Sequence, residues 1–187
     1  MVNILVISGS TRSGRQSIKA AEYVTNYIND EYGAKAELLD LAKYRLPVFD
    51  DNNKRHESLK SDLETIRTKM LDSDGIVVVS PEYNGGMAGS LKNTLDYFRK
   101  EYEWRPFGAV SVSVGTLGGQ NAMNQLTHFA SYVQACLMPN RLLVSEINKI
   151  DDNGSAAERF HGDAKAFSRD MVRFCKAITD SGLRDNQ

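Results

Sequence analysis

The chain has 187 residues, of which 41% are hydrophobic and 25% are charged, and its formal net charge at pH 7 is −1. This length favours one domain spanning residues 1–187, and the near-neutral charge provides no field that attracts nucleic acid or an anionic membrane. Because no segment approaches the roughly 20 apolar residues of a bilayer span, we expect a cytoplasmic protein with neither partner.

Apolar runs alternate with segments of helical periodicity along the whole chain. The predicted strands cover residues 2–8, 36–41, 76–80, 107–114 and 142–147. The predicted helices begin near residue 16 or 17 and end at Gly33, and then cover 57–71, 91–98, 123–133 and 160–178. This βαβαβαβαβα order predicts an α/β fold with a parallel sheet and helices on both faces.

Cysteine and histidine residues give no sign of a metal site. Cys136 and Cys175 are far apart in the chain, and His56, His128 and His161 are scattered without ligand spacing. We therefore expect two buried, reduced thiols and no metal.

The first loop, residues 8–17, follows the first strand and is rich in hydroxyl groups, glycine and arginine. A phosphate needs several converging donors, and a helix N-terminus supplies both amides and a favourable dipole. Arg12 and Arg15 add charge, while Gly9 and Gly14 let the backbone turn tightly and expose its amides. The loop matches neither G-x-G-x-x-G nor the P-loop pattern. The alternative is a Ser/Gly-rich turn that only caps the helix.

The second loop, residues 80–89, follows the third predicted strand. Pro81 is expected to end that strand, because proline fixes its own φ and lacks an N–H. Tyr83 and Asn84 can present a ring and an amide, and Gly85 permits close approach by a flat ligand. Taken alone, this segment is only a Gly-rich turn.

The third loop, residues 115–120, follows the fourth predicted strand and contains three glycines. The carboxyl ends of parallel strands border the ligand crevice of an open α/β sheet. The three loops should therefore meet at one edge of the sheet and bind a mononucleotide, with a flavin as the best fit.

Two separated motifs resemble those of the NADPH-dependent FMN reductase family. They are Gly9-Ser10-Thr11-Arg12 continued by Gly14-Arg15, and Pro81-Glu82-Tyr83-Asn84-Gly85 followed by Leu91-Lys92-Asn93 and Leu95-Asp96. The resemblance implies a flavodoxin-like three-layer sandwich with a five-stranded parallel sheet in the order 2-1-3-4-5. Met87-Ala88 departs from the proline that many members have there.

The resemblance also implies the binding residues. The FMN phosphate would be held by Ser10, Arg12, Arg15, Gln16 and Ser17; the isoalloxazine would be lined by Pro81, Glu82, Tyr83, Asn84 and Gly85, with Gly115, Thr116, Gly118 and Gly119 closing its other edge. No catalytic side chain is implied. Lys92, Asn93 and Asp96 are as well explained by ties between the loop and its helix or by a subunit contact.

The implied activity is an NAD(P)H-dependent FMN reductase or quinone reductase, with NADPH or NADH as donor. Hydride would pass to the flavin, and a quinone, azo compound, free flavin or metal oxyanion would collect the electrons in a ping-pong cycle. Family members commonly form homodimers or homotetramers. Trp104 is a candidate for the interface or for the pocket rim. The alternative function is a non-enzymatic flavodoxin-like electron carrier or redox-sensing module.

Overall fold

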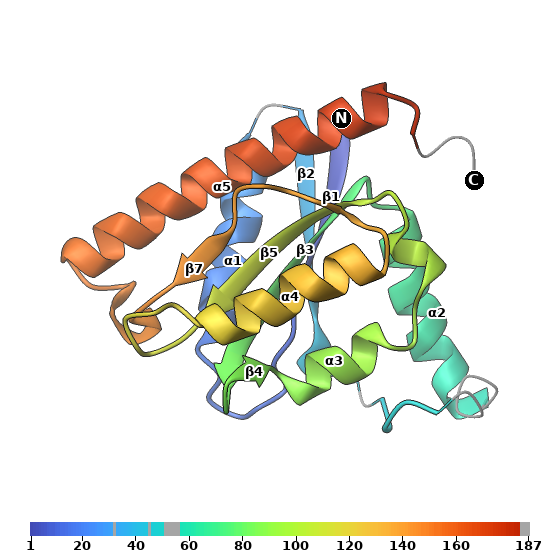
Figure 1. Cartoon of the computed structure of the whole chain (residues 1–187), viewed down its shortest axis with the longest axis horizontal. Coiled ribbons are helices and arrows are strands. Elements are labelled where there is room, and N and C mark those ends of the chain that lie inside the picture. Colours follow the sequence, from blue (N-terminus) through green and yellow to red (C-terminus); the bar gives the residue numbers. More distant parts are fainter. Residues whose placement is uncertain (32, 45, 51–56, 184–187) are drawn as a thin grey trace.

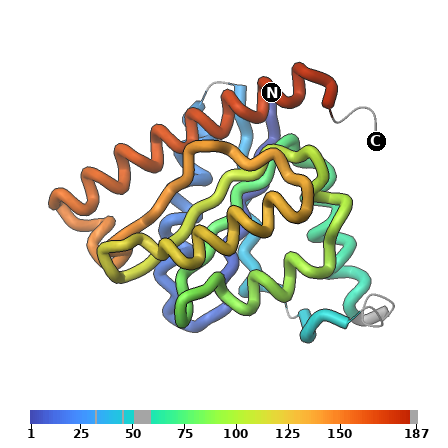
Figure 2. The backbone as a smooth tube through the Cα atoms, in the orientation of Figure 1, coloured from blue at the N-terminus to red at the C-terminus, as the bar shows by residue number. Residues whose placement is uncertain are grey.

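The computed structural model describes residues 1–31, 33–44, 46–50 and 57–183. A central sheet is covered on one face by the first and last helices, which lie side by side, and on the other face by the remaining three (Figures 1 and 2). The helices are α1 (Ser17–Asn29), α2 (Glu57–Leu71), α3 (Gly89–Leu95), α4 (Gln120–Tyr132) and α5 (Ser155–Asp180). This arrangement confirms the three-layer α/β prediction.

The sheet has the order β2-β1-β3-β5-β6, with β7 also paired to β5. These strands are all parallel and comprise β1 (Val2–Ser8), β2 (Ala34–Asp40), β3 (Gly75–Tyr83), β5 (Pro106–Val112), β6 (Cys136–Leu137) and β7 (Leu142–Val144). The expected 2-1-3-4-5 order is therefore confirmed. Since β1, β3 and β5 are adjacent and parallel, the three loops that follow them leave the same edge of the sheet.

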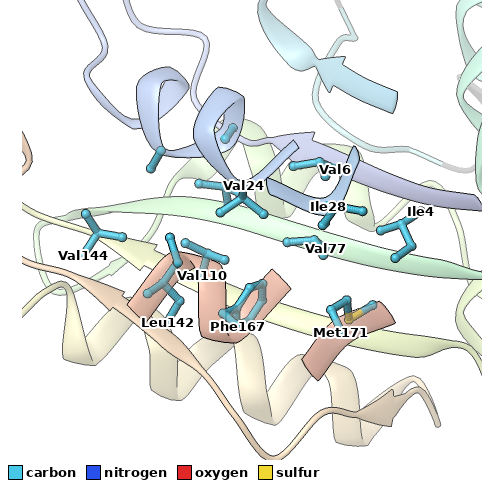
Figure 3. Packing of buried hydrophobic residues seen from close by; sticks show 14 of the residues in the cluster. Ile4, Val6, Val24, Ile28, Val77, Val110, Leu142, Val144, Phe167 and Met171 are labelled. Atoms are coloured by element: carbon cyan, nitrogen blue, oxygen red, sulfur yellow. The ribbon is translucent and has the colours of Figure 1, made fainter. Parts of the chain in front are cut away.

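The central strands are apolar on both faces because helices cover both. Val6, Val77 and Val110 are completely buried between the sheet and the helix pair α1 and α5. Val24 of α1 and Phe167 of α5 pack onto this layer, as Figure 3 shows. This two-sided burial explains why the strands appear in the sequence as continuous apolar runs.

The last position of the sheet differs from the prediction of one strand at 142–147. Two short strands occupy it: β6 pairs with the start of β5, and β7 pairs with its end. Pro139 lies between them and supplies no N–H for a continuous ladder. The segment beyond Val144 turns into a 3₁₀ helix, Ile147–Lys149.

The third strand continues through Pro81, so the prediction that Pro81 ends it was wrong. Pro81 pairs with Val112, because an extended strand tolerates the φ of proline and only a donor is lost. The chain then reverses into β4 (Gly86–Met87), which pairs antiparallel with the end of β3. Asn84 and Gly85 form the turn with φ of 50° and 75°. Two consecutive positive φ values are typical of a type I′ hairpin turn.

Other boundaries shift by a few residues. Helix α1 ends at Asn29, while Gly33 has φ 77° in the turn before β2 and its carbonyl accepts the Val2 amide at 2.9 Å. Helix α3 ends at Leu95 rather than at residue 98. Within the part of the chain that the structure describes, no helix is both long and apolar enough to span a bilayer.

Candidate functional site

Buried polar atoms without partners are concentrated in the first loop. Over the described residues, four buried side-chain nitrogen or oxygen atoms have no hydrogen-bond partner: Ser8 Oγ, Arg15 Nε, Ser17 Oγ and, inside α5, Ser168 Oγ. Three of the four lie between residues 8 and 17. An unsatisfied buried polar group costs about 1–3 kcal/mol, so the clustering of such groups makes the first loop the candidate binding site.

The N-terminus of α1 adds to this set of donors. Its capping position, Gln16, makes no side-chain hydrogen bond to the first helical amides. Instead, the side-chain Nε2 of Gln16 donates a long hydrogen bond of 3.4 Å to the Gly14 carbonyl. Uncapped amides carry the positive end of the helix dipole, which favours an anion. The first loop and the start of α1 therefore fit a phosphate group.

The two arginines of the first loop have different partners. Arg15 Nη2 donates to Asp40 Oδ2 at 2.6 Å, and both side chains are mostly buried. Arg12 is exposed, and its guanidinium carbon lies 5.5 Å from the centre of the Tyr83 ring. Among the described residues Arg12 has no carboxylate partner, so its charge is available to an anion.

The two glycines of the first loop have separate roles. A Cβ at Gly9 would lie 2.8 Å from Leu91 side-chain atoms, so Gly9 is required by the close approach of α3. Ser90 Oγ also donates to the Gly9 carbonyl at 2.7 Å. Gly14 has φ 69°, and a Cβ atom at this position would have no neighbour within 4 Å. Only Gly14 therefore serves the turn itself, as expected, whereas Gly9 serves packing.

The second loop is joined to the first by hydroxyl groups. Ser10 is completely buried, and its Oγ lies 2.7 Å from Tyr83 Oη. The same Ser10 Oγ accepts the Arg12 amide at 3.3 Å. The Ser10 hydroxyl is thus turned toward protein groups, although the sequence predicts that it holds a phosphate.

Glu82 fastens the second loop to the start of α4. Its Oε2 accepts the backbone amides of Asn121 at 2.8 Å and Ala122 at 3.2 Å, and its Oε1 accepts Asn121 Nδ2 at 3.2 Å. Burial alone would raise the pKa of Glu82, but these hydrogen bonds together lower it below its ordinary value. The side chain is a helix cap, so only the backbone of Glu82 remains available to a ligand.

The third loop places its predicted residues in two environments. Gly118 and Gly119 are buried with φ of 62° and 78°, and Cβ atoms there would meet Leu143 and Val112. These two glycines are therefore packed against the sheet. Gly115 and Thr116 are exposed. Their apolar neighbours are exposed as well, Val114 to 72% and Leu117 to 76%.

The structure thus brings all three loops together at the carboxyl edge of the sheet. Tyr83 contacts the first loop, and Glu82 contacts the helix that follows the third. Pro81 is buried, while Asn84 and Gly85 are exposed at the tip of the hairpin. The predicted cofactor residues therefore divide into an exposed group and a group that supports it.

Three supporting residues were not foreseen. Asp40 neutralises Arg15, and Asn121 donates to Glu82. Gln125 Oε1 accepts the Met87 amide of β4 at 2.9 Å. No local pattern identifies these partners, because each pairs with a residue far away in the sequence. The hairpin was also missed, although Asn84-Gly85 is the strongest short-range signal for one.

Residues of α3 make structural ties. Asn93 Oδ1 accepts the Phe49 amide at 2.7 Å, and Asn93 Nδ2 donates to the Pro47 carbonyl at 2.7 Å. Lys92 forms an ion pair with Asp96 at 2.6 Å. These contacts are structural, but they tie α3 to residues 47–49 and Lys92 to Asp96, and none of them joins the helix to the second loop as predicted.

Trp104 does not border this site. It immediately precedes β5 (Pro106–Val112), and so lies at the amino edge of the sheet, opposite the three loops. The indole is 45% exposed, and its backbone has φ 53°. Of the two places left open for Trp104, the structure excludes the pocket rim, and the interface stays a prediction.

Comparisons with known proteins agree with this geometry. The family model for NADPH-dependent FMN reductase matches residues 2–149. An NADPH azoreductase of Bacillus sp. (strain OY1-2) is 32% identical, with 94% of this chain and 92% of that protein covered. An FMN-dependent NADPH-azoreductase of Staphylococcus saprophyticus is 28% identical, with 92% and 94% covered.

A solved structure shares the fold. FerB, a flavoenzyme NAD(P)H:(acceptor) oxidoreductase from Paracoccus denitrificans, superposes with a TM-score of 0.71 at 19% identity, covering 92% of this chain and 98% of that one. The sequence matches, the fold and the loop arrangement agree with one another. The chain belongs to the NADPH-dependent FMN reductase family, a family of oxidoreductase enzymes that use FMN as cofactor and NAD(P)H as electron donor.

Proposed function

We propose that the protein binds FMN at the carboxyl edge of the sheet and uses NAD(P)H to reduce a small aromatic acceptor. The observation that carries this proposal is the cluster of three buried, unpaired polar atoms in the first loop beside the uncapped start of α1. A phosphate supplies the acceptors that these donors lack. Membership of the family and the names of its relatives support the choice of FMN.

The described residues divide the work of holding FMN. Arg12, Arg15 Nε, Ser17 and the first amides of α1 hold the phosphate. The exposed turn of the β3–β4 hairpin and the exposed Gly115 and Thr116 border the ring. When bound, FMN supplies the two-electron chemistry, by accepting hydride from NAD(P)H and passing electrons to an acceptor. The protein would orient the cofactor through these groups and would leave one face of the ring open.

The acceptor class follows from the surface beside the ring. Val114 and Leu117 of the third loop are both largely exposed, and they offer an apolar border to a planar aromatic molecule. Two relatives are named azoreductases, which favours an azo compound over a quinone, a free flavin or a metal oxyanion. Donor and acceptor occupy the same open face in turn. Parallel lines in double-reciprocal plots at varied acceptor concentration test this ping-pong order.

The proposed assembly is a homodimer or a homotetramer. A groove of about 730 Å³ between α3 and α4 begins at Met87 of the β3–β4 hairpin, whose turn is part of the proposed site. Tyr132 on its wall is 70% exposed and offers an aromatic contact to a symmetric partner. Sedimentation of the wild type should give a dimer or tetramer, and Tyr132→Asp should weaken it. A monomeric wild type contradicts this assembly.

The reductase proposal is tested by the visible absorbance of the FMN-loaded protein under anaerobic conditions. Prompt bleaching of the flavin band by NADPH or NADH is expected. A bound flavin that neither nucleotide bleaches would favour the electron carrier or redox sensor. Failure to bind FMN would overturn the proposal itself.

A further inference from the structure

The last two residues of β3 link different parts of the site. Side chains alternate along a strand, so neighbouring residues point to opposite sides. Glu82 reaches the start of α4, whereas Tyr83 reaches the first loop, where its Oη lies 2.7 Å from Ser10 Oγ. The end of β3 therefore connects the ring side of the site with the phosphate side.

Tyr83 contacts the first loop in two ways. Its hydroxyl meets Ser10, which is completely buried and which accepts the Arg12 amide at 3.3 Å. Its ring lies beneath the Arg12 guanidinium at 5.5 Å. Tyr83 thus positions Arg12 in two ways: it holds the backbone amide through Ser10, and it contacts the guanidinium through its ring. Since the Ser10 hydroxyl contacts Tyr83, it supports the first loop from the buried side and does not lie on the loop surface.

We propose that Tyr83 is a positioning residue that holds the first loop in its phosphate-binding conformation, on the basis of the FMN site proposed above. The contribution of the phosphate to FMN affinity then depends on Tyr83, a residue of the second loop. The inference extends the role of Tyr83 from bordering the ring to organising the opposite end of the cofactor.

Riboflavin provides the decisive comparison, because it has the same ring as FMN and no phosphate. Tyr83→Phe keeps the aromatic ring and removes only the hydroxyl. We expect this variant to bind FMN about fivefold more weakly, the equivalent of one net hydrogen bond. Riboflavin affinity should be unchanged. The ratio of the two dissociation constants, measured by flavin fluorescence quenching, therefore reports the phosphate end alone.

Ser10→Ala removes the same hydrogen bond from the other side, together with the acceptor of the Arg12 amide, so it should change that ratio at least as much. The double variant should be no worse than Ser10→Ala alone, because Tyr83→Phe deletes a hydrogen bond that Ser10→Ala has already removed. Tyr27→Phe is the matched control: Tyr27 Oη lies 2.7 Å from His161 Nδ1, in the contact of α1 with α5. It should leave the ratio at its wild-type value.

Equal weakening of FMN and riboflavin in Tyr83→Phe would overturn the inference, since it would indicate a role at the ring only. Independent, additive effects of the two single substitutions would overturn it as well. Thermal unfolding of each variant without flavin checks that the fold is intact. If the wild type binds riboflavin as tightly as FMN, the proposed phosphate site itself is contradicted. This outcome differs from one in which only the role of Tyr83 is wrong, because the wild type then still binds FMN more tightly than riboflavin.

Discussion

The two edges of the sheet treat their buried polar groups in opposite ways. At the amino edge, Arg105 is only 4% exposed, but its Nε donates to the Glu101 carbonyl at 2.7 Å and its Nη1 donates to the Ser73 carbonyl. The Glu101 carboxylate in turn accepts Arg67 Nε at 2.8 Å and the Arg99 amide at 2.9 Å. Charges are buried there with their partners present.

At the carboxyl edge, the buried groups of the first loop have no partners. Ser8 Oγ, Ser17 Oγ and Arg15 Nε are all unpaired. Folding alone therefore gains nothing from burying these atoms. The comparison teaches that a fully paired polar cluster indicates a structural role, whereas an unpaired cluster at a loop and helix start indicates a ligand.

The largest expected effect is at the amino edge. Arg105→Met keeps an unbranched apolar stem but leaves the carbonyls of Glu101 and Ser73 without their donor. We expect the free energy of unfolding to fall by about 3 kcal/mol in urea denaturation. Arg169→Met, at an exposed and distant ion pair, should change it by less than about 0.5 kcal/mol. A loss below about 1 kcal/mol for Arg105→Met would break the comparison.

Arg12 should show the reverse behaviour, affecting binding and not stability. Arg12→Ala removes a charge-assisted contact with the phosphate, and we expect FMN to bind about 30-fold more weakly, since such contacts contribute about 2 kcal/mol. Lys165→Ala is the control, because Lys165 also contacts a tyrosine ring but lies on α5, outside the three loops. Its Nζ is 5.4 Å from the centre of the Tyr27 ring. Unchanged FMN affinity in Arg12→Ala would contradict the phosphate assignment.

Ser17 offers a sharper test, because its substitution should lower FMN affinity without lowering the stability of the flavin-free protein. Ser17→Ala removes an unpaired buried hydroxyl, so the flavin-free protein should be as stable as the wild type or more so. FMN affinity should fall about fivefold. Ser168→Ala removes the unpaired hydroxyl inside α5, away from the three loops, and should leave FMN affinity unchanged. A loss of stability in Ser17→Ala without a loss of affinity would refute a ligand role.

The smallest effect is expected at Glu82. Its pKa is lowered in the folded protein, so its carboxylate stabilises the fold above the ordinary carboxyl pKa and this contribution is lost as the pH falls through the lowered pKa. At pH 7, Glu82→Gln should cost about 0.5 kcal/mol. The difference from the wild type should shrink between about pH 5 and about pH 3. Urea denaturation across this range measures it; a constant difference would contradict the capping role.

The strand order was implied by the resemblance to the FMN reductase family. The sequence itself predicted the helix-covered parallel sheet and the meeting of the three loops. Those features follow from apolar periodicity and from the geometry of parallel strands, both of which are local or general. The sequence did not predict which of the site residues are exposed to a ligand and which support the site from below. Arg15 is neutralised by Asp40, and Glu82 caps α4, because tertiary contacts over 25 and 39 residues decide the partners of long side chains.

Glycines illustrate the same limit. The sequence predicts that the glycines of the three loops serve tight turns or close approach by a ligand. Gly9 instead accommodates Leu91, and Gly118 accommodates Leu143 in addition to its positive φ in the turn. Which surface a glycine faces depends on the packing of other elements. By contrast, the Asn84-Gly85 turn was recognisable from the sequence, because only its local backbone requirement is involved.

The most direct test of the FMN site is a crystal structure of the protein with FMN bound. We expect the phosphate oxygens to lie within hydrogen-bond distance of Ser17 Oγ and the first amides of α1, with Arg12 turned toward them and the ring beside the Asn84-Gly85 turn. A phosphate bound elsewhere, with Ser8, Arg15 Nε and Ser17 still unpaired, would contradict the account.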